Sequence, residues 1–252
     1  MRLRTPNSEL RTVWAQDPKL ATLPLTLDEV LSQVESYTPR KVLFWGEGAG
    51  RISSYAAGWI AGRRGDVVVL DGANRFDPYM VSSFARKVLT SPERLLKKIR
   101  IARAFTCYQM ATLIEERLVS LLEQKGEIAQ QQRPWVILLG LTTPFLDEDV
   151  SEREVRPLFE RSLRKVEAIA AGGIPFFLFQ PFASSEHHSL FNKRGVGRLT
   201  DSKRTYLMKR LFQFSDEIWK ISLEDQGLKM ILEKKIADGL WRIEKSHSST
   251  LR

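Results

Sequence analysis

Short apolar runs alternate along this chain with longer segments of helical periodicity, and this alternation leaves few folds open. The short runs are rich in β-branched and aromatic residues, as in residues 66–70 and Trp135–Leu139. The longer segments, such as Glu152–Ala171, carry apolar residues every three or four positions, which predicts amphipathic helices. Strands that are apolar on both faces and separated by helices favour a parallel sheet with helices on each side.

The expected elements extend over most of the chain. The predicted strands are residues 41–45, 66–70, 100–105, 135–139, 174–179, 217–221, 228–234 and 240–244. The predicted helices are residues 27–36, 53–61, 78–89, 108–122, 152–171 and 205–214. Short links join the last three strands, which indicates an antiparallel edge. The predicted fold class is α/β: a doubly wound, mainly parallel sheet flanked by helices, with antiparallel C-terminal edge strands. Residues 1–38 are expected to form an N-terminal extension with one helix, and residues 39–252 the core domain.

Composition indicates the cellular compartment and the kind of partner expected for such a domain. The 252 residues include a single cysteine, Cys107, so an internal disulfide is excluded and a reducing cytoplasm is expected. The first residues lack the apolar run of a signal peptide, and no apolar run approaches the ~20 residues that span a bilayer. The formal net charge of +9 favours polyanionic partners, although a basic surface kept for solubility gives the same count.

A glycine-rich stretch follows the first predicted strand, where parallel sheets bind ligands. Glycines before a helix N-terminus can cradle phosphate groups with main-chain N–H groups. Against the pattern G-x-x-x-x-G-K-[ST], Gly50 on the second glycine places Arg51 on the lysine and Ile52 on the metal-binding hydroxyl. The alternative is a plain strand-to-helix turn. The candidate phosphate contacts in this stretch are Gly46, Gly48, Gly50, Arg51 and Ser53.

Three further segments carry a resemblance to a known family. Residues 70–76 read Leu-Asp-Gly-Ala-Asn-Arg-Phe, residues 101–106 read Ile-Ala-Arg-Ala-Phe-Thr, and the strand after residues 152–171 ends near Gln180. In order and approximate spacing, residues 41–182 resemble the RecA/RadA-like recombinase superfamily, as a degenerate, paralogue-like member. The resemblance implies a RecA-like core and adds Gln180 to the nucleotide-site candidates.

Most functional residues of that family have no counterpart here. The water-activating glutamate falls on Ala73, the Walker B aspartate on Gly140, the metal-binding hydroxyl on Ile52 and the lysine on Arg51. Phosphoryl transfer depends on a positioned metal and an oriented water. The resemblance therefore implies no catalytic residues and no metal, and leaves room for ATP or ADP without strong magnesium coordination.

The acidic residues offer a second route to a metal, which we do not favour. Asp71, Asp77, Asp147, Glu148 and Asp149 lie near predicted strand ends, but they have no metal-ligand spacing. Carboxylates in a turn before a helix are more simply explained by the helix dipole.

The resemblance also indicates where nucleic acid would bind. In the family, two loops face DNA, and they match residues 142–154, which are acidic here, and residues 183–202. The second loop combines basic groups with an aromatic ring, as single-strand binding surfaces do, although a plain surface loop remains the alternative. The candidate DNA contacts are His187, His188, Phe191, Lys193, Arg194 and Arg198.

Three functions follow from these observations. The leading one is a non-catalytic RecA-fold accessory protein of DNA repair or recombination that binds single-stranded DNA, another RecA-fold subunit or a repair protein. Residues 1–40 contain no phenylalanine for the family's F-x-x-A assembly element, so a filament is not expected, although a smaller oligomer is compatible with the sequence. The others are a divergent ATPase that uses Arg51 and Ser53, and an interaction scaffold that binds no DNA.

Overall fold

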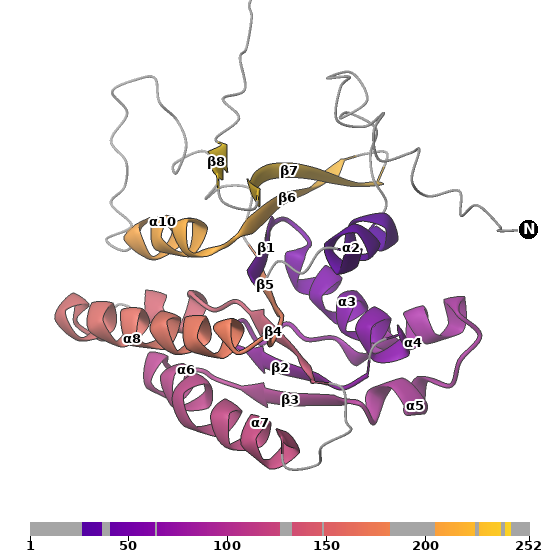
Figure 1. The fold of residues 1–252 in the computed structure, drawn as a ribbon, viewed down its shortest axis with the longest axis horizontal. Coiled ribbons are helices and arrows are strands. Elements are labelled where there is room, and N and C mark those ends of the chain that lie inside the picture. The colour runs from indigo at the N-terminus through magenta and orange to yellow at the C-terminus, as the bar shows by residue number, and fades with distance from the viewer. Residues whose placement is uncertain are drawn as a thin grey trace, which may run out of the picture.

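The computed structural model describes residues 27–36, 41–63, 65–126, 133–147, 149–181, 205–224, 227–237 and 240–242. Its centre is an eight-stranded sheet in the order β3-β2-β4-β5-β1-β6-β7-β8 (Figure 1). Strands β1 to β6 are mutually parallel, β7 is antiparallel to β6, and β8 is antiparallel to β7. The strands are β1 Lys41–Gly46, β2 Val67–Asp71, β3 Ile99–Arg103, β4 Trp135–Leu139, β5 Phe176–Pro181, β6 Glu217–Glu224, β7 Gly227–Ala237 and β8 Leu240–Arg242.

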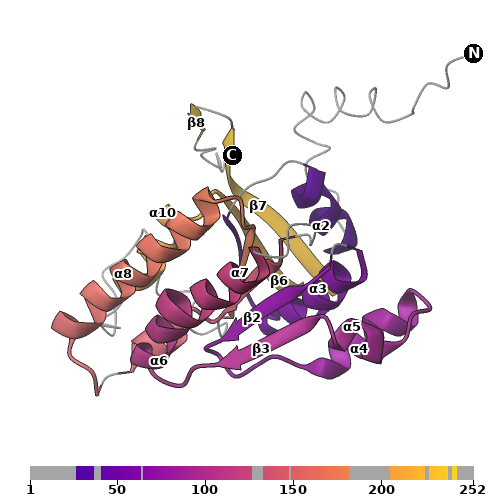
Figure 2. The same ribbon diagram turned by 60° about the horizontal axis from the view of Figure 1, so that its bottom comes forward.

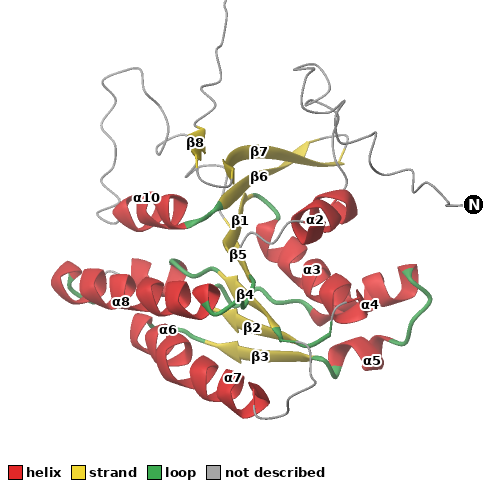
Figure 3. Ribbon diagram, in the orientation of Figure 1, coloured by secondary structure: helices red, strands yellow, loops and turns green. Residues whose placement is uncertain are grey.

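Helices cover both faces of the sheet and bury a separate apolar core on each (Figure 3). One face carries α2 Leu27–Ser36, α3 Ala49–Arg63, α4 Pro78–Lys87 and α5 Pro92–Leu96. The other carries α6 Cys107–Thr112, a π-helical turn Leu113–Arg117, α7 Leu118–Gly126, α8 Glu152–Ala171 and α10 Thr205–Phe214. Because β1 is covered on both sides, Val42 and Phe44 enter the first core while Leu43 and Trp45 enter the second.

The predicted fold class is confirmed at the level of an α/β protein with a mostly parallel sheet, flanking helices and antiparallel edge strands. Several element bounds differ from the expectation by one to four residues, and the helix expected over residues 108–122 contains a π-helical turn. Helix α3 begins at Ala49 rather than residue 53, because Gly50 belongs to its first turn. Strand β3 ends at Arg103, so Phe105 lies beyond it. The short helix α5 was not predicted.

Helix α2 packs on the same core as α3 and α4. Its Val30, Leu31 and Val34 are buried in that cluster, and Asp28 forms an ion pair with Lys87 at the end of α4. The helix assigned to an N-terminal extension therefore contributes to the core.

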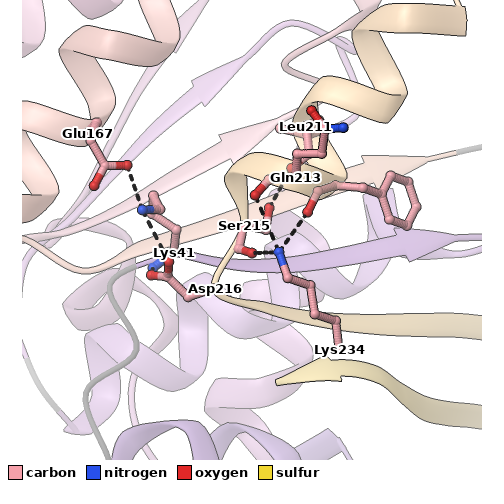
Figure 4. A network of polar contacts seen from close by, with 8 residues as sticks. Lys41, Glu167, Leu211, Gln213, Ser215, Asp216 and Lys234 are labelled. Atoms are coloured by element: carbon pink, nitrogen blue, oxygen red, sulfur yellow. Dashed lines mark hydrogen bonds and ion pairs between the residues drawn. The ribbon is translucent and has the colours of Figure 1, made fainter. Parts of the chain in front are cut away.

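The amino end of β1 carries a network of buried charge (Figure 4). Lys41 is 5% exposed, and its Nζ lies 2.6 Å from Glu167 Oε2 on α8 and 3.2 Å from Asp216 Oδ1 before β6. The main-chain N–H of Lys41 also donates to Asp216 Oδ2, at 3.0 Å. On β7, Lys234 directs its Nζ at main-chain oxygens at the end of α10. These oxygens belong to Phe212, Gln213 and Ser215.

Candidate functional site

The turn from β1 into α3 is shorter than a phosphate-binding loop of the expected pattern. Strand β1 ends at Gly46 and α3 begins at Ala49, so only Glu47 and Gly48 separate them. Gly46 and Gly48 have φ angles of 118° and 82°, which favour glycine. A Cβ added at Gly46 would lie 2.1 Å from the carbonyl oxygen of Ile221 on β6. Close strand packing is thus sufficient reason for the first glycine.

The other candidates at this turn do not all face the same space. Ser53 is fully buried and its Oγ donates to the carbonyl oxygen of Gly50 at 2.6 Å, within the helix. Arg51 is exposed, whereas Ile52, on the position of the metal-binding hydroxyl, packs in the core. The structure places Gly46, Gly48, Gly50 and Arg51 along one short turn, and the hydroxyl of Ser53 is already bonded to the carbonyl oxygen of Gly50.

Arg75 was missed by the sequence analysis, yet its side chain lies directly over this turn. A Cβ added at Gly50 would lie 3.2 Å from Arg75 Cδ and 3.3 Å from its Cβ. Arg75 belongs to the loop after β2, and its position in the sequence gives no sign that this loop reaches the start of α3. The aliphatic part of the Arg75 side chain therefore packs against Gly50 in the first turn of α3.

Gln180, the sixth nucleotide-site candidate, holds a neighbouring loop. It lies at the carboxyl end of β5, where it is 2% exposed. Its Oε1 accepts the main-chain N–H of Thr142 at 3.2 Å, and its Nε2 donates to the carbonyl oxygen of Pro181 at 3.5 Å. The contact with Thr142 links the end of β5 to the loop after β4, and the contact with Pro181 lies within β5.

The loops after β2 and β4 meet with no room for a side chain between them. Gly140 has a φ of 64°, and a Cβ added there would lie 2.5 Å from Ala73 Cβ and 2.9 Å from Thr143 Oγ1. A Cβ at Gly72 would lie 2.8 Å from the carbonyl oxygen of Gly140. The main-chain N–H of Gly72 also donates to Leu139 O at 2.8 Å. The positions that match the family's two catalytic carboxylates, Ala73 and Gly140, are therefore in direct contact.

The one buried carboxylate near this contact, Asp71, is occupied by its own loop. Its Oδ1 accepts the main-chain N–H groups of Ala73 and Arg75, both at 3.2 Å, and its Oδ2 accepts that of Phe76 at 2.9 Å. Arg103 Nε lies 3.7 Å from Oδ2. Asp71 thus shapes residues 72–76, and its oxygens are already shared among four donors.

The remaining acidic candidates also serve local structure. Asp77 caps α4 by accepting the N–H of Tyr79 at 2.9 Å, and Asp147 accepts that of Asp149 at 3.1 Å. Glu148 lies outside the described residues. Within the described ranges, no three His, Cys, Asp or Glu side chains gather as a metal site would require.

The structure describes most of the acidic loop expected to face DNA and none of the candidate contacts in the basic loop. In the acidic loop, Glu154 accepts hydrogen bonds from Tyr108 and Ser151, and the bond from Tyr108 in particular lowers the pKa of Glu154. This carboxylate therefore stays charged to lower pH, which opposes phosphate binding there. All six candidates in the basic loop lie outside the described residues. They are His187, His188, Phe191, Lys193, Arg194 and Arg198.

Comparison with known proteins adds no family to this picture. No protein-family model matches the chain, and no curated protein is significantly similar to it. Among the described helices, none combines the length and apolar composition that a bilayer crossing requires. The described residues define a three-layer α/β protein with a tight glycine turn at the start of α3 and neutral, closely packed loops beside it.

Proposed function

We propose that this chain is a non-catalytic, RecA-like accessory protein of DNA repair or recombination that acts in the cytoplasm and binds single-stranded DNA. The arrangement of six parallel strands followed by an antiparallel C-terminal edge agrees with a RecA-like core. The order of the segments that resemble the recombinases supports the same assignment. The net charge of +9 supports a polyanionic partner.

The contact between Gly140 and Ala73 carries the non-catalytic part of the proposal. Hydrolysis of a nucleotide requires a carboxylate that holds the metal and a group that orients the attacking water. The 2.5 Å separation between a Cβ added at Gly140 and the Cβ of Ala73 leaves no space for a carboxylate at position 140, and the alanine at position 73 has no group to orient water. Ser53, the nearest hydroxyl to the expected metal position, is bonded within α3. The chain retains the glycine turn between β1 and α3 and lacks the metal-binding and water-orienting groups that hydrolysis requires.

Binding of a fluorescein-labelled single-stranded oligonucleotide, followed by anisotropy, tests this function. The proposal expects binding that weakens with added salt and is unchanged when ATP is omitted at constant Mg²⁺ and ionic strength, because no nucleotide-dependent state is needed. Binding that appears only with Mg-ATP would contradict it. Absence of binding even at low salt would leave the interaction scaffold as the better account.

A further inference from the structure

Strand β3 forms one end of the sheet (Figure 2). Within the described part of the chain, β3 pairs only with β2. Three of its five residues, Arg100, Ile101 and Arg103, are exposed. We call the exposed side chains along and beside this strand the β3 edge. They are Lys97, Arg100, Ile101, Arg103 and Phe105.

The β3 edge is strongly positive. Residues 91–105 include five basic residues and one acidic residue, Glu93. Lys98 is used internally, since its Nζ donates to the carbonyl oxygen of Ala61 at 2.9 Å. Lys97 and Arg100 form no ion pair or side-chain hydrogen bond with any described residue. Two cations on one short edge are therefore free to bind anionic groups.

An exposed aromatic ring lies just beyond the carboxyl end of β3. Phe105 is 65% exposed, although its main-chain N–H is fixed by a 2.8 Å hydrogen bond to Gln109 Oε1. The N-cap of α6, formed by Thr106 and the N–H of Gln109, holds the same turn. A large apolar ring that the backbone holds in solvent gains free energy when a flat apolar surface covers it.

We infer that the β3 edge is a binding track for single-stranded nucleic acid, an inference that rests on the proposed function and locates its contacts. Side chains of a strand alternate between its faces, so Arg100 lies on one face of β3 and Arg103 on the other. With Lys97 before the strand, these cations contact phosphates from both sides of an edge about 17 Å long. Phe105 provides a stacking platform for a base at the end of this track. Arg103 remains 47% exposed beside Asp71, so its guanidinium can still reach a phosphate.

An acidic peptide that pairs with the free edge of β3 is the other partner to consider. Such a peptide would use the same cations, but it would leave Phe105 uncovered, because the ring lies two residues beyond the last residue of the strand. The exposed side chains of β3 itself include only one aliphatic residue, Ile101. Cations on both faces of an edge that ends in an exposed aromatic ring favour nucleic acid over a peptide strand.

Anisotropy titrations of a labelled oligothymidylate with the full chain and four variants test this inference. The double variant Lys97→Glu/Arg100→Glu is expected to bind about tenfold or more weakly at about 50 mM salt, and its salt slope falls by about 0.7 for each phosphate that is no longer neutralised. Phe105→Ala is expected to weaken binding by about five- to hundredfold, and Phe105→Trp to retain it within about twofold. The matched control is Arg164→Glu, an exposed and equally unpaired cation on α8, with an expected change below about twofold.

The outcomes separate this inference from the proposed function. If the wild-type chain binds no oligonucleotide, both fail. If it binds and the β3 variants behave like Arg164→Glu, the track is wrong while the function stands. A Lys193→Glu/Arg194→Glu variant would then test the basic loop. If polyglutamate competes as well as the oligonucleotide and Phe105→Ala has no effect, the edge binds acidic peptides and the inference is overturned.

Discussion

The two ends of the parallel sheet treat charge in opposite ways. At the amino end, Lys41 is buried and paired with Glu167 and Asp216 (Figure 4). At the carboxyl end, where a nucleotide enzyme needs free carboxylates, Gly140 packs against Ala73. Buried charge is costly unless each charged group has a partner. A cation is therefore buried at the amino end through two carboxylates, whereas at the carboxyl end the buried charge, Asp71, is held by main-chain donors and the contact beside it is neutral.

The largest expected change in the free energy of unfolding comes from adding a side chain at Gly140, at the carboxyl end of the sheet. Gly140→Ala places a Cβ 2.5 Å from that of Ala73 and forces alanine into a φ of 64°. We expect a loss of about 3 kcal/mol in the free energy of unfolding, measured by urea denaturation. The control is Gly172→Ala, where the nearest atom is 3.2 Å away and the φ is ordinary. A loss below about 1 kcal/mol at Gly140 would mean that the two loops have room for a side chain.

The free energy of unfolding should also fall when Lys41, the buried cation at the amino end of the sheet, loses its charge. Lys41→Met keeps the apolar stem and removes the charge that Glu167 and Asp216 share. Because these two carboxylates are 50% and 26% exposed and can partly rehydrate, we expect a loss of about 2 kcal/mol, below the range for a fully buried pair. The measurement is again the urea midpoint, with Arg164→Met as the exposed control. An unchanged midpoint would show that the network adds nothing to stability.

A smaller loss is expected from the helix end beside that network. Lys234→Met removes the donor that satisfies three main-chain oxygens at the end of α10. Those oxygens can bind water instead, so the expected loss is about 1 kcal/mol. Hydrogen exchange of the last turn of α10 should rise in this variant. Exchange rates equal to those of the wild-type chain would argue against a capping role for Lys234.

The smallest change in the free energy of unfolding is expected from a substitution at the turn between β1 and α3. Gly50→Ala meets only the flexible side chain of Arg75, at 3.2 Å, and lies within a helix where alanine is favoured. We expect a change within about 1 kcal/mol of zero, with a small gain as the favoured sign. A loss above about 2 kcal/mol by urea denaturation would contradict this expectation and indicate that the Arg75 side chain cannot move aside.

The sequence predicted the long periodic elements well. The bounds expected for α2, α8 and α10 agree with the structure, because each has a regular apolar stripe. Helix α5 has only five residues, too few for a periodicity to appear. The start of α3 was placed too late because glycines were interpreted as loop, although Gly50 forms part of the helix.

The candidate site was predicted less completely, because its decisive features are contacts between distant segments. The absence of carboxylates at Ala73 and Gly140 is visible in the sequence, but the contact between them depends on β2 and β4 being neighbours in the sheet. The same holds for Arg75 over Gly50. The inward turn of Ser53 follows from its place on α3, one position beyond Ile52.

The central claim is that this chain does not hydrolyse nucleotides. Phosphate release from Mg-ATP, measured with and without single-stranded DNA, tests this claim most directly. We predict a rate equal to the buffer background for the wild-type chain, for Arg51→Ala and in the presence of DNA. Steady turnover by the wild-type chain that disappears in Arg51→Ala would contradict this claim, because the turn between β1 and α3 would then be an active nucleotide site.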